Sequence, residues 1–184
     1  ELEGIHSRTD FDLSQHEKFS GKKLQYFDHE ENKSYVPYVL ETSIGLDRMF
    51  LAVYSNSLQE EELENGTSRV VLKLPAVLAP TKAAILPLVK KDGLPEIARK
   101  IVEDLKWDFS VTYDEKDAVG RRYRRQDAVG TPFCITVDHD TLEDNTVTIR
   151  HRDTMEQKRV KIKELRDIIK KEVDVKSWLM KMNG

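Results

Sequence analysis

The stretch "TKAAILPLVKKDGLPEIARKIVEDLKWDFSVTYD", residues 81–114, contains the pattern that decides the fold. Its apolar run at 81–89 predicts a strand, the segment 93–107 predicts a helix, and residues 108–114 predict a second strand. The apolar residues of the predicted helix share one face: Ile97, Ala98, Ile101, Val102 and Leu105. Because strands separated by helices of about ten residues or more form βαβ units, this stretch predicts an α/β fold with a largely parallel sheet.

The alternation of apolar strands and amphipathic segments continues to the end of the chain. Further predicted elements are a helix at 116–130, a strand at 132–138, a hairpin of 145–153 and 158–165, and a helix at 164–173. From about Pro80 onward we therefore expect a compact domain, with a mixed, largely parallel five-stranded sheet flanked by helices. We assign this domain to residues 76–184.

The first part of the chain, residues 1–75, has a different pattern. The predicted elements are a strand at 2–5, a helix at 10–21, an antiparallel hairpin within 22–40, a turn at 41–45 and a helix from Leu46. Asp10 or Asp12 could cap the first helix, and Gly21 would end it. We expect residues 35–40 to form a strand buried on most of its surface, although Pro37 favours an edge or bulge. The acidic segment 56–66 predicts an exposed connection.

The overall composition narrows the function classes. The chain has 184 residues, 39% of them hydrophobic, with 30 basic and 33 acidic side chains, so its net charge of −3 does not by itself indicate nucleic acid. A single cysteine, Cys134, excludes an internal disulfide and a Cys-rich zinc site. No apolar run approaches the roughly 20 residues that span a bilayer. We expect a cytoplasmic protein.

Polar residues interrupt two apolar runs in "YVPYVLETSIGLDRMFLAVY", residues 35–54. Glu41 follows apolar neighbours, so its carboxylate requires either an arginine partner or the ammonium group of a ligand. Ser43 could cap the following helix, and glycine at 45 would permit a turn or a close ligand. Arg48 lies in the first helical turn, where the helix dipole opposes a cation, and it is either a solvated surface residue or a ligand contact.

Residues Arg8, Asp10, Asp12 and His16 suggest a metal or acid/base site, but no pair has the close histidine spacing of a zinc helix. A capped surface helix explains them better. The chain also contains neither a nucleophile paired with a base nor a Gly-rich phosphate loop. The sequence therefore predicts no catalytic side chain and no metal site.

Two basic groups lie in the second part of the chain. The first surrounds an aromatic residue in "GRRYRRQ": Arg121, Arg122, Tyr123, Arg124 and Arg125. On a helix these arginines would form a positive ridge. The second group is Arg150, His151, Arg152 and Asp153 at the end of the predicted hairpin. Arginines beside an aromatic suit single-stranded RNA, whereas the alternative for each group is a solvated face.

The strings "ELEGIHSRTDFDL", "ETSIGLDR", "LAPTKAAILPL", "GRRYRRQDAVGTPFCITVD" and "TIRHRDTMEQKRV" together resemble the class II glycyl-tRNA synthetases of homodimeric bacterial type. The resemblance implies ATP binding by Glu1, Leu2, Gly45, Leu46, Asp47 and Arg48. It implies glycine binding by Glu41, Thr42, Ser43, Ile44 and Gly45. It implies an anticodon-binding domain whose tRNA contacts are Arg121, Arg122, Tyr123, Arg124, Arg125, Arg150, Arg152 and Asp153.

The same resemblance implies that ATP with Mg²⁺, glycine and its tRNA are the partners of a homodimeric enzyme. Thr42 departs from the family, because many relatives have proline there. No string resembles the first or second signature motif of class II synthetases, so residues 1–75 would be the C-terminal remnant of a catalytic domain, inactive alone. The alternatives are a related class II synthetase, a non-ligase accessory factor, or an α/β interaction domain whose arginines contact protein.

Overall fold

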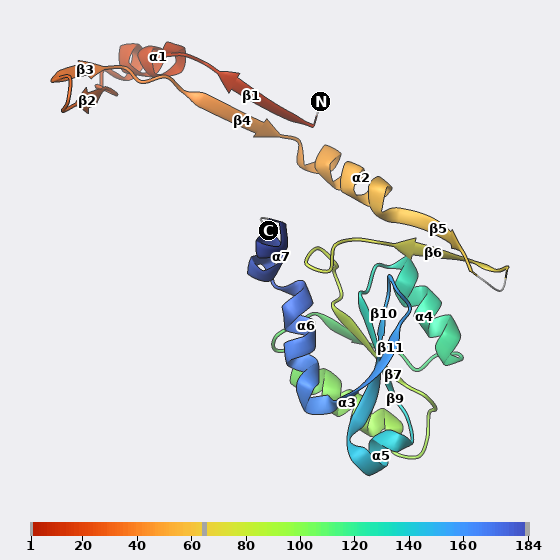
Figure 1. Ribbon diagram of the computed structural model, residues 1–184. Coiled ribbons are helices and arrows are strands. Elements are labelled where there is room, and N and C mark those ends of the chain that lie inside the picture. The colour runs from red at the N-terminus through yellow and green to blue at the C-terminus, as the bar shows by residue number, and fades with distance from the viewer. Residues whose placement is uncertain (1, 64–65, 183–184) are drawn as a thin grey trace. The chain divides into compact units, whose positions relative to one another are not determined.

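The computed structural model describes residues 2–63 and 66–182 (Figure 1). The chain divides into two compact units between Ala52 and Val53. Helix α2 (Leu46–Ser57) crosses this division. This division separates two compact units and does not test the domain boundary expected near residue 75, which stays a prediction.

The second unit is built on a five-stranded sheet. Its strands are β7 (Ala83–Pro87), β8 (Val111–Tyr113), β9 (Phe133–Val137), β10 (Thr146–His151) and β11 (Gln157–Lys161). In space their order is β11-β10-β9-β7-β8. Strand β7 is parallel to β8 and β9, and β10 is antiparallel to β9 and β11. Within this sheet β10 runs opposite to the other four strands, which confirms a mixed sheet in which most strands run the same way.

Helices cover both faces of this sheet (Figure 1). The helices are α3 (Leu94–Leu105), α4 (Val119–Ala128), α5 (Asp140–Asp144), α6 (Leu165–Val173) and α7 (Val175–Met182), with the short η1 (Ile162–Glu164) before α6. Residues of α3 and α6 share the larger core with Ile85, Ile135 and Ile149. On the other face Tyr123 of α4 packs on Ala84, Leu86 and Cys134.

The helical face predicted for α3 is confirmed. Ala98, Ile101 and Leu105 are buried in the larger core, and Ile97 and Val102 pack against it. By contrast, sequence periodicity gave no indication of α5 or α7, which are short.

The acidic segment 56–66 is exposed at most of its described positions, as expected, but it is more than a connection; residues 64 and 65 lie outside the described residues. It contributes β5 (Leu58–Glu62), which pairs antiparallel with β6 (Ser68–Leu72). One of its glutamates, Glu61, pairs with Arg69 and Lys73. Strand β6 lies against α4, so the hairpin belongs to the second unit.

The first unit contains β1 (Glu3–Ser7), α1 (Phe11–Ser20), β2 (Tyr26–Asp28), β3 (Lys33–Tyr35) and β4 (Leu40–Ile44). Strands β1 and β4 pair antiparallel, as do β2 and β3. Helix α1 ends at Gly21 (φ +66°), as predicted, but the Asp10 side chain accepts no capping hydrogen bond at the start of the helix. The expected α+β character of this part is thus present locally.

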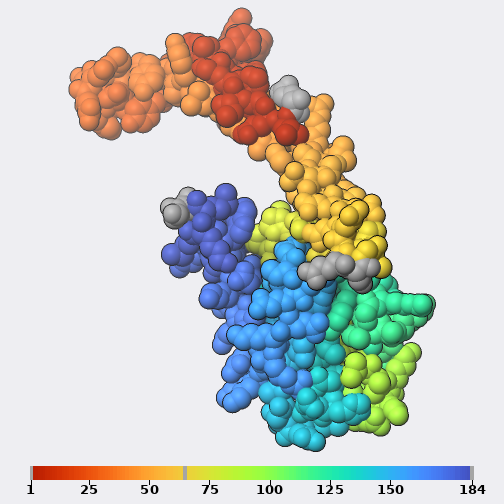
Figure 2. All heavy atoms as spheres, turned by 45° about the vertical axis from the view of Figure 1, so that its right-hand side comes forward, coloured from red at the N-terminus to blue at the C-terminus, as the bar shows by residue number. Residues whose placement is uncertain are grey.

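Two expectations for residues 35–45 were wrong. The single strand 35–40 is split, because β3 ends at Tyr35, β4 begins at Leu40 and Pro37 lies between them. Residues 41–44 belong to β4, so the turn is reduced to Gly45, whose carbonyl accepts a hydrogen bond from Met49 N. Leu40 is 77% exposed, so the strand is not buried. This unit is coloured red to orange in Figure 2, and most of its described residues are exposed.

Candidate nucleic-acid interface

Helix α4 holds the first basic group, and Arg122 points into the unit. Its side chain is fully buried, and its guanidinium donates to the carbonyls of Pro87 (2.7 Å), Leu88 (3.2 Å) and Asp114 (3.1 Å). Its Nε has no hydrogen-bond partner within the described residues. Burial lowers the pKa of Arg122, because the charged form is desolvated. Arg122 therefore fastens the ends of β7 and β8 to α4.

Arg125 fastens the loop that precedes α4. It donates to the carboxylates of Asp114 (2.7 Å) and Asp117 (2.8 Å) and to the carbonyl of Lys116 (2.6 Å). The hydrogen bonds that Arg125 donates to Asp114 and Asp117 raise its pKa. Its side chain remains 42% exposed, although all three guanidinium nitrogens donate hydrogen bonds to this loop.

The four arginines do not form one exposed ridge, contrary to the expectation from helical spacing. Arg121 is exposed, Arg124 is half-buried and donates to the Ser68 carbonyl (3.0 Å), and Arg122 lies inside. A helical wheel cannot distinguish these cases, since both the sheet and the β5–β6 hairpin cover parts of α4. The exposed cationic surface consists of Arg121, Arg125 and part of Arg124.

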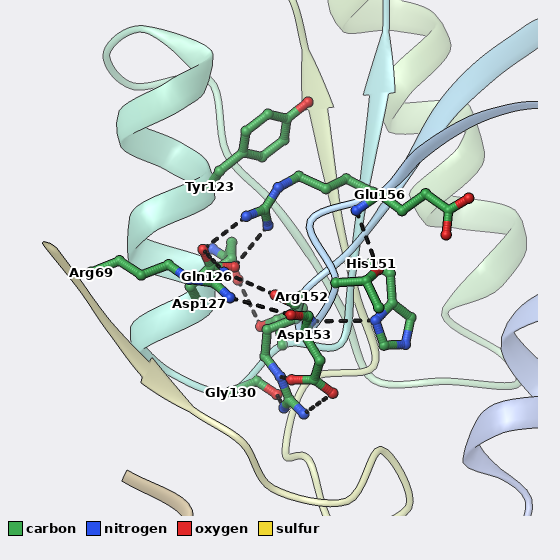
Figure 3. A network of polar contacts seen from close by, with 12 residues as sticks. Arg69, Tyr123, Gln126, Asp127, Gly130, His151, Arg152, Asp153 and Glu156 are labelled. Carbon is green, nitrogen blue, oxygen red and sulfur yellow. Dashed lines mark hydrogen bonds and ion pairs between the residues drawn. The ribbon is translucent and has the colours of Figure 1, made fainter. Parts of the chain in front are cut away.

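A buried polar network joins α4 to β6 and β10 (Figure 3). The fully buried Asp127 carboxylate accepts two hydrogen bonds from Arg150 (2.8 and 3.0 Å) and one from Arg69 (2.9 Å). Arg69 also pairs with Glu61, so two cations meet two carboxylates. The Arg150 guanidinium lies 4.9 Å from the ring centroid of Tyr123. This network fixes the position of Arg150.

Arg152 is also buried, at 2% exposure. It donates to the carbonyls of Gly130 (2.8 Å) and Leu74 (2.7 Å) and to the Asp153 carboxylate (2.7 Å). Burial would raise the pKa of Asp153, but the hydrogen bond and charge of Arg152 outweigh it and hold that pKa below its usual value. Arg152 therefore ties the β10–β11 turn to the segment that directly follows β6.

Sequence reasoning missed Arg69 and Asp127, the two residues that complete the network. A signal was present at Arg69, because it alternates with Val71 on the buried side of β6 and an arginine there needs a carboxylate. Asp127 had a weaker signal: it lies four residues after Tyr123, on the face of α4 that contains the buried Arg122 and Gln126. Its partners are distant in sequence.

Most of the candidate ATP- and glycine-binding residues lie along β4 and at the start of α2. Glu41 pairs with Arg8 (Nε to Oε2, 3.4 Å), and Arg8 also pairs with Asp12, so the arginine partner considered for Glu41 is present. Thr42, Ser43, Ile44, Gly45, Leu46, Asp47 and Arg48 are all exposed, as is Leu2. Glu1 lies outside the described residues. Ser43 lies within β4, opposite Gly4 of β1, and not at the position directly before α2, where a capping residue would stand.

The antiparallel pairing of β1 with β4 brings two sets of residues predicted to bind ATP, one at the start of β1 and one after β4, to the same end of this strand pair. Glu3 is opposite Ile44, so Leu2 lies at the end where β4 leads into Gly45 and α2. Residues expected to border ATP from opposite ends of the first unit's sequence are thus neighbours. No described residues gather as three or more potential metal ligands, and no described helix is long and apolar enough to cross a membrane.

Comparisons with known proteins agree with this arrangement. The family model described as "Anticodon binding domain" matches residues 82–172, which contain all five sheet strands and α3 to α6 up to residue 172. A solved structure, the RNA-binding domain of threonyl-tRNA synthetase from Cryptosporidium parvum, has a TM-score of 0.63 at 19% identity. It covers 81% of this chain and 35% of that chain, and at this identity it supports the fold alone.

Curated relatives are more similar in sequence. Glycine–tRNA ligase of Chlorobaculum tepidum is 56% identical over 160 residues, covering 87% of this chain and 34% of the relative. The corresponding protein of Clostridium beijerinckii is 54% identical over 169 residues, covering 92% and 36%. This chain spans about a third of the length of these relatives. With identity above one half across most of its residues and an anticodon-binding domain at 82–172, the chain belongs to the glycine–tRNA ligase family.

Proposed function

We propose that this chain supplies anticodon recognition to an enzyme that attaches glycine to its tRNA. The observation that carries the proposal is the match of residues 82–172 to an anticodon-binding domain within a chain that resembles glycine–tRNA ligases throughout. Glycine codons share two guanines, so the anticodons of glycine tRNAs share two cytosines that such a domain can read. The cytoplasm is where this reaction would take place.

The contacts with tRNA would be divided between two groups of arginines. Arg121 and Arg125 are exposed and Arg124 is half-buried, so in this proposal their positive charges would meet phosphates. Arg122, Arg150 and Arg152 are buried, so their contribution is to hold α4 and the β10–β11 turn in place, together with Tyr123 and Asp153. This division keeps all eight predicted residues in the interface but gives them different tasks.

The first unit would contribute part of the ATP and glycine site. In this proposal the β4–α2 junction, residues 41–48, lies against glycine and ATP, and Mg²⁺ supplies charge stabilisation on the phosphates. Glycine would react with ATP to form glycyl-adenylate, and a ribose hydroxyl of the tRNA would then take the glycyl group. The enzyme would act as a homodimer. Since no residues resemble the phosphate-binding motif, this chain alone should have negligible adenylation activity.

Filter retention of glycine tRNA by the chain at low salt tests the proposal. We expect tight binding that weakens when the two shared anticodon cytosines are replaced. Binding should also fall as salt rises, because arginine contacts with phosphate release counterions. Equal retention of both tRNAs would leave nonspecific charge as the explanation and would contradict anticodon recognition.

The second candidate function is an α/β interaction domain that contacts protein. The exposed arginines support it, because they could bind an acidic protein surface as well as RNA. Arg121→Ala with Arg124→Ala separates the two cases, since neither side chain belongs to the buried network. Weakened tRNA retention at unchanged thermal stability would favour RNA. Unchanged retention would favour a protein partner.

A further inference from the structure

The C-terminal part of the second unit is basic, although the whole chain is acidic. Residues 157–182 contain nine lysines and arginines against four aspartates and glutamates, a net charge of +5 within a chain whose net charge is −3. These residues form β11, η1, α6 and α7, and in Figure 2 they are coloured blue on one side of the second unit. They create a local positive field that the composition of the whole chain conceals.

Three lysines of this segment have exposed side chains without a bonded partner. Lys170 and Lys171 lie near the end of α6, and Lys176 lies in the first turn of α7. Among the described residues, none of these ammonium groups makes a hydrogen bond or an ion pair. Lys181 of α7 differs, since it pairs with Glu172 (3.0 Å). Neighbouring lysines without counter-charges repel one another, and an anionic ligand would relieve that repulsion.

The same lysines line two adjoining surface hollows, which together we call the α6–α7 groove. The first hollow has a volume of about 440 Å³ and is lined by Asp167, Lys170, Lys171, Asp174, Lys176 and Ser177. The second hollow, of about 460 Å³, shares Lys170 with the first and extends to Lys82. Hydrogen bonds to the carbonyls of Ala76 (3.0 Å) and Val77 (2.8 Å) hold the Lys82 ammonium group at that end. Cations therefore lie along the whole groove.

Carboxylates also line the groove, but two of the three have partners. Asp108 pairs with Arg166 (3.2 Å). Asp174 accepts hydrogen bonds from the backbone N and the hydroxyl of Ser177 (2.8 and 2.9 Å), which hold the pKa of Asp174 below its usual value. Within the described part of the chain, Asp167 has no bonded partner. The free lysines thus outnumber the free carboxylate, so the groove favours an anion.

The groove adjoins the proposed tRNA interface through the edge strand β11. Lys158 of β11 and Ile168 of α6 line one cavity together with Glu156 of the β10–β11 turn. Lys171 follows Ile168 by three residues, so it lies on the neighbouring part of the α6 surface. Helix α6 covers the sheet face opposite to α4. The groove is therefore a second basic surface, reached from the β10–β11 turn around the β11 edge.

We propose that the α6–α7 groove binds the phosphate backbone of the tRNA outside the anticodon loop, in the paired stem that closes this loop. The proposal rests on the anticodon-recognition function and adds a second contact surface to it. The stem continues directly from the loop, so a loop held at the β10–β11 turn brings stem phosphates to the neighbouring surface. Lysines bind phosphates as point charges, and side chains cannot read the deep major groove of paired RNA. The groove should therefore add affinity without distinguishing anticodons.

The test combines Lys170→Gln, Lys171→Gln and Lys176→Gln in the full chain, because glutamine removes the charge but has a helix propensity similar to that of lysine. Binding of glycine tRNA is measured between about 50 and 200 mM salt. At the lower salt concentration the affinity should fall about tenfold or more. The slope of log affinity against log salt should become shallower by about 2–3, since three phosphate contacts are lost. The preference over a tRNA with both anticodon cytosines replaced should stay unchanged.

Lys22→Gln, Lys23→Gln and Lys100→Gln together are the matched control. These lysines are exposed, their removal changes the net charge by the same amount, and none of them lines the groove. Affinity and slope should stay close to those of the unchanged chain.

Equal losses in the two triple variants would assign the effect to net charge and overturn the groove proposal. An unchanged slope in the groove variant would overturn it too, and so would a lost anticodon preference in that variant. If the unchanged chain binds both tRNAs equally, anticodon recognition fails, while the comparison of slopes still decides the groove. A chain that binds neither tRNA would overturn both proposals.

Discussion

The two units of this protein contain similar apolar patterns but differ in what those patterns bury. In the second unit, Ile85, Ile135 and Ile169 are completely buried between the sheet and its helices. In the first unit, Ile5 of β1 is 74% exposed and Leu40 of β4 is 77% exposed, although both belong to paired strands. A strand pattern thus specifies pairing, whereas burial also requires a second layer of structure.

The largest expected effect concerns charge burial in the two units. Asp127→Asn removes the carboxylate that compensates Arg69 and Arg150, so it should lower the free energy of unfolding by about 3–5 kcal/mol. Asp12→Asn in the first unit breaks an exposed pair with Arg8 and should have a much smaller effect. Urea denaturation followed by circular dichroism measures both changes. Equal effects would mean that the buried network contributes no more than a surface pair.

The next effect concerns apolar burial. Ile135→Ala should leave a cavity in the core and destabilise the second unit by about 2–5 kcal/mol. Ile5→Ala removes a side chain that is mostly in solvent, so the change should stay within about 0.5 kcal/mol. Amide hydrogen exchange in each unit reports the two results separately. A large loss for Ile5→Ala would show that β1 is covered in solution.

The smallest effect concerns two glycines in left-handed backbone conformations. At Gly130 (φ +82°) a Cβ would lie 3.1 Å from the Leu72 carbonyl oxygen, so Gly130→Ala combines backbone strain with a clash and should cost about 1–3 kcal/mol. At Gly21 (φ +66°) no atom lies within 4 Å, so Gly21→Ala should cost only the strain, about 1 kcal/mol. Thermal unfolding distinguishes them. If the two substitutions cost the same, the contact between β6 and the end of α4 is able to relax.

Sequence periodicity predicted burial best for helices that pack one apolar face on the sheet, such as α3. The buried face of α3 and the βαβ pattern around it were predictable, because each depends on residues close together in the sequence. The polar residues of α4 were harder to interpret. Arg121 and Arg122 are adjacent and chemically identical, yet one is exposed and the other buried, because the carbonyls that Arg122 meets lie at the ends of β7 and β8.

The acidic segment 56–66 also shows that the sequence alone cannot predict the surroundings of a charged residue. Its acidic composition is typical of an exposed connection, but β5 forms because β6 supplies a partner strand and because Arg69 and Lys73 neutralise Glu61. Composition alone cannot show whether a charge is solvated or paired.

The sequence by itself determined the α/β alternation, the helical face of α3, the hairpin of β10 and β11, and the resemblance to a family. These features follow from local spacing and from the order of short strings along the chain. Only the tertiary structure decided which arginines are buried and which sheet face each residue of β10 occupies. The physical reason is that a buried charge is defined by its partner, and Asp127 lies 58 residues from Arg69 and 23 from Arg150.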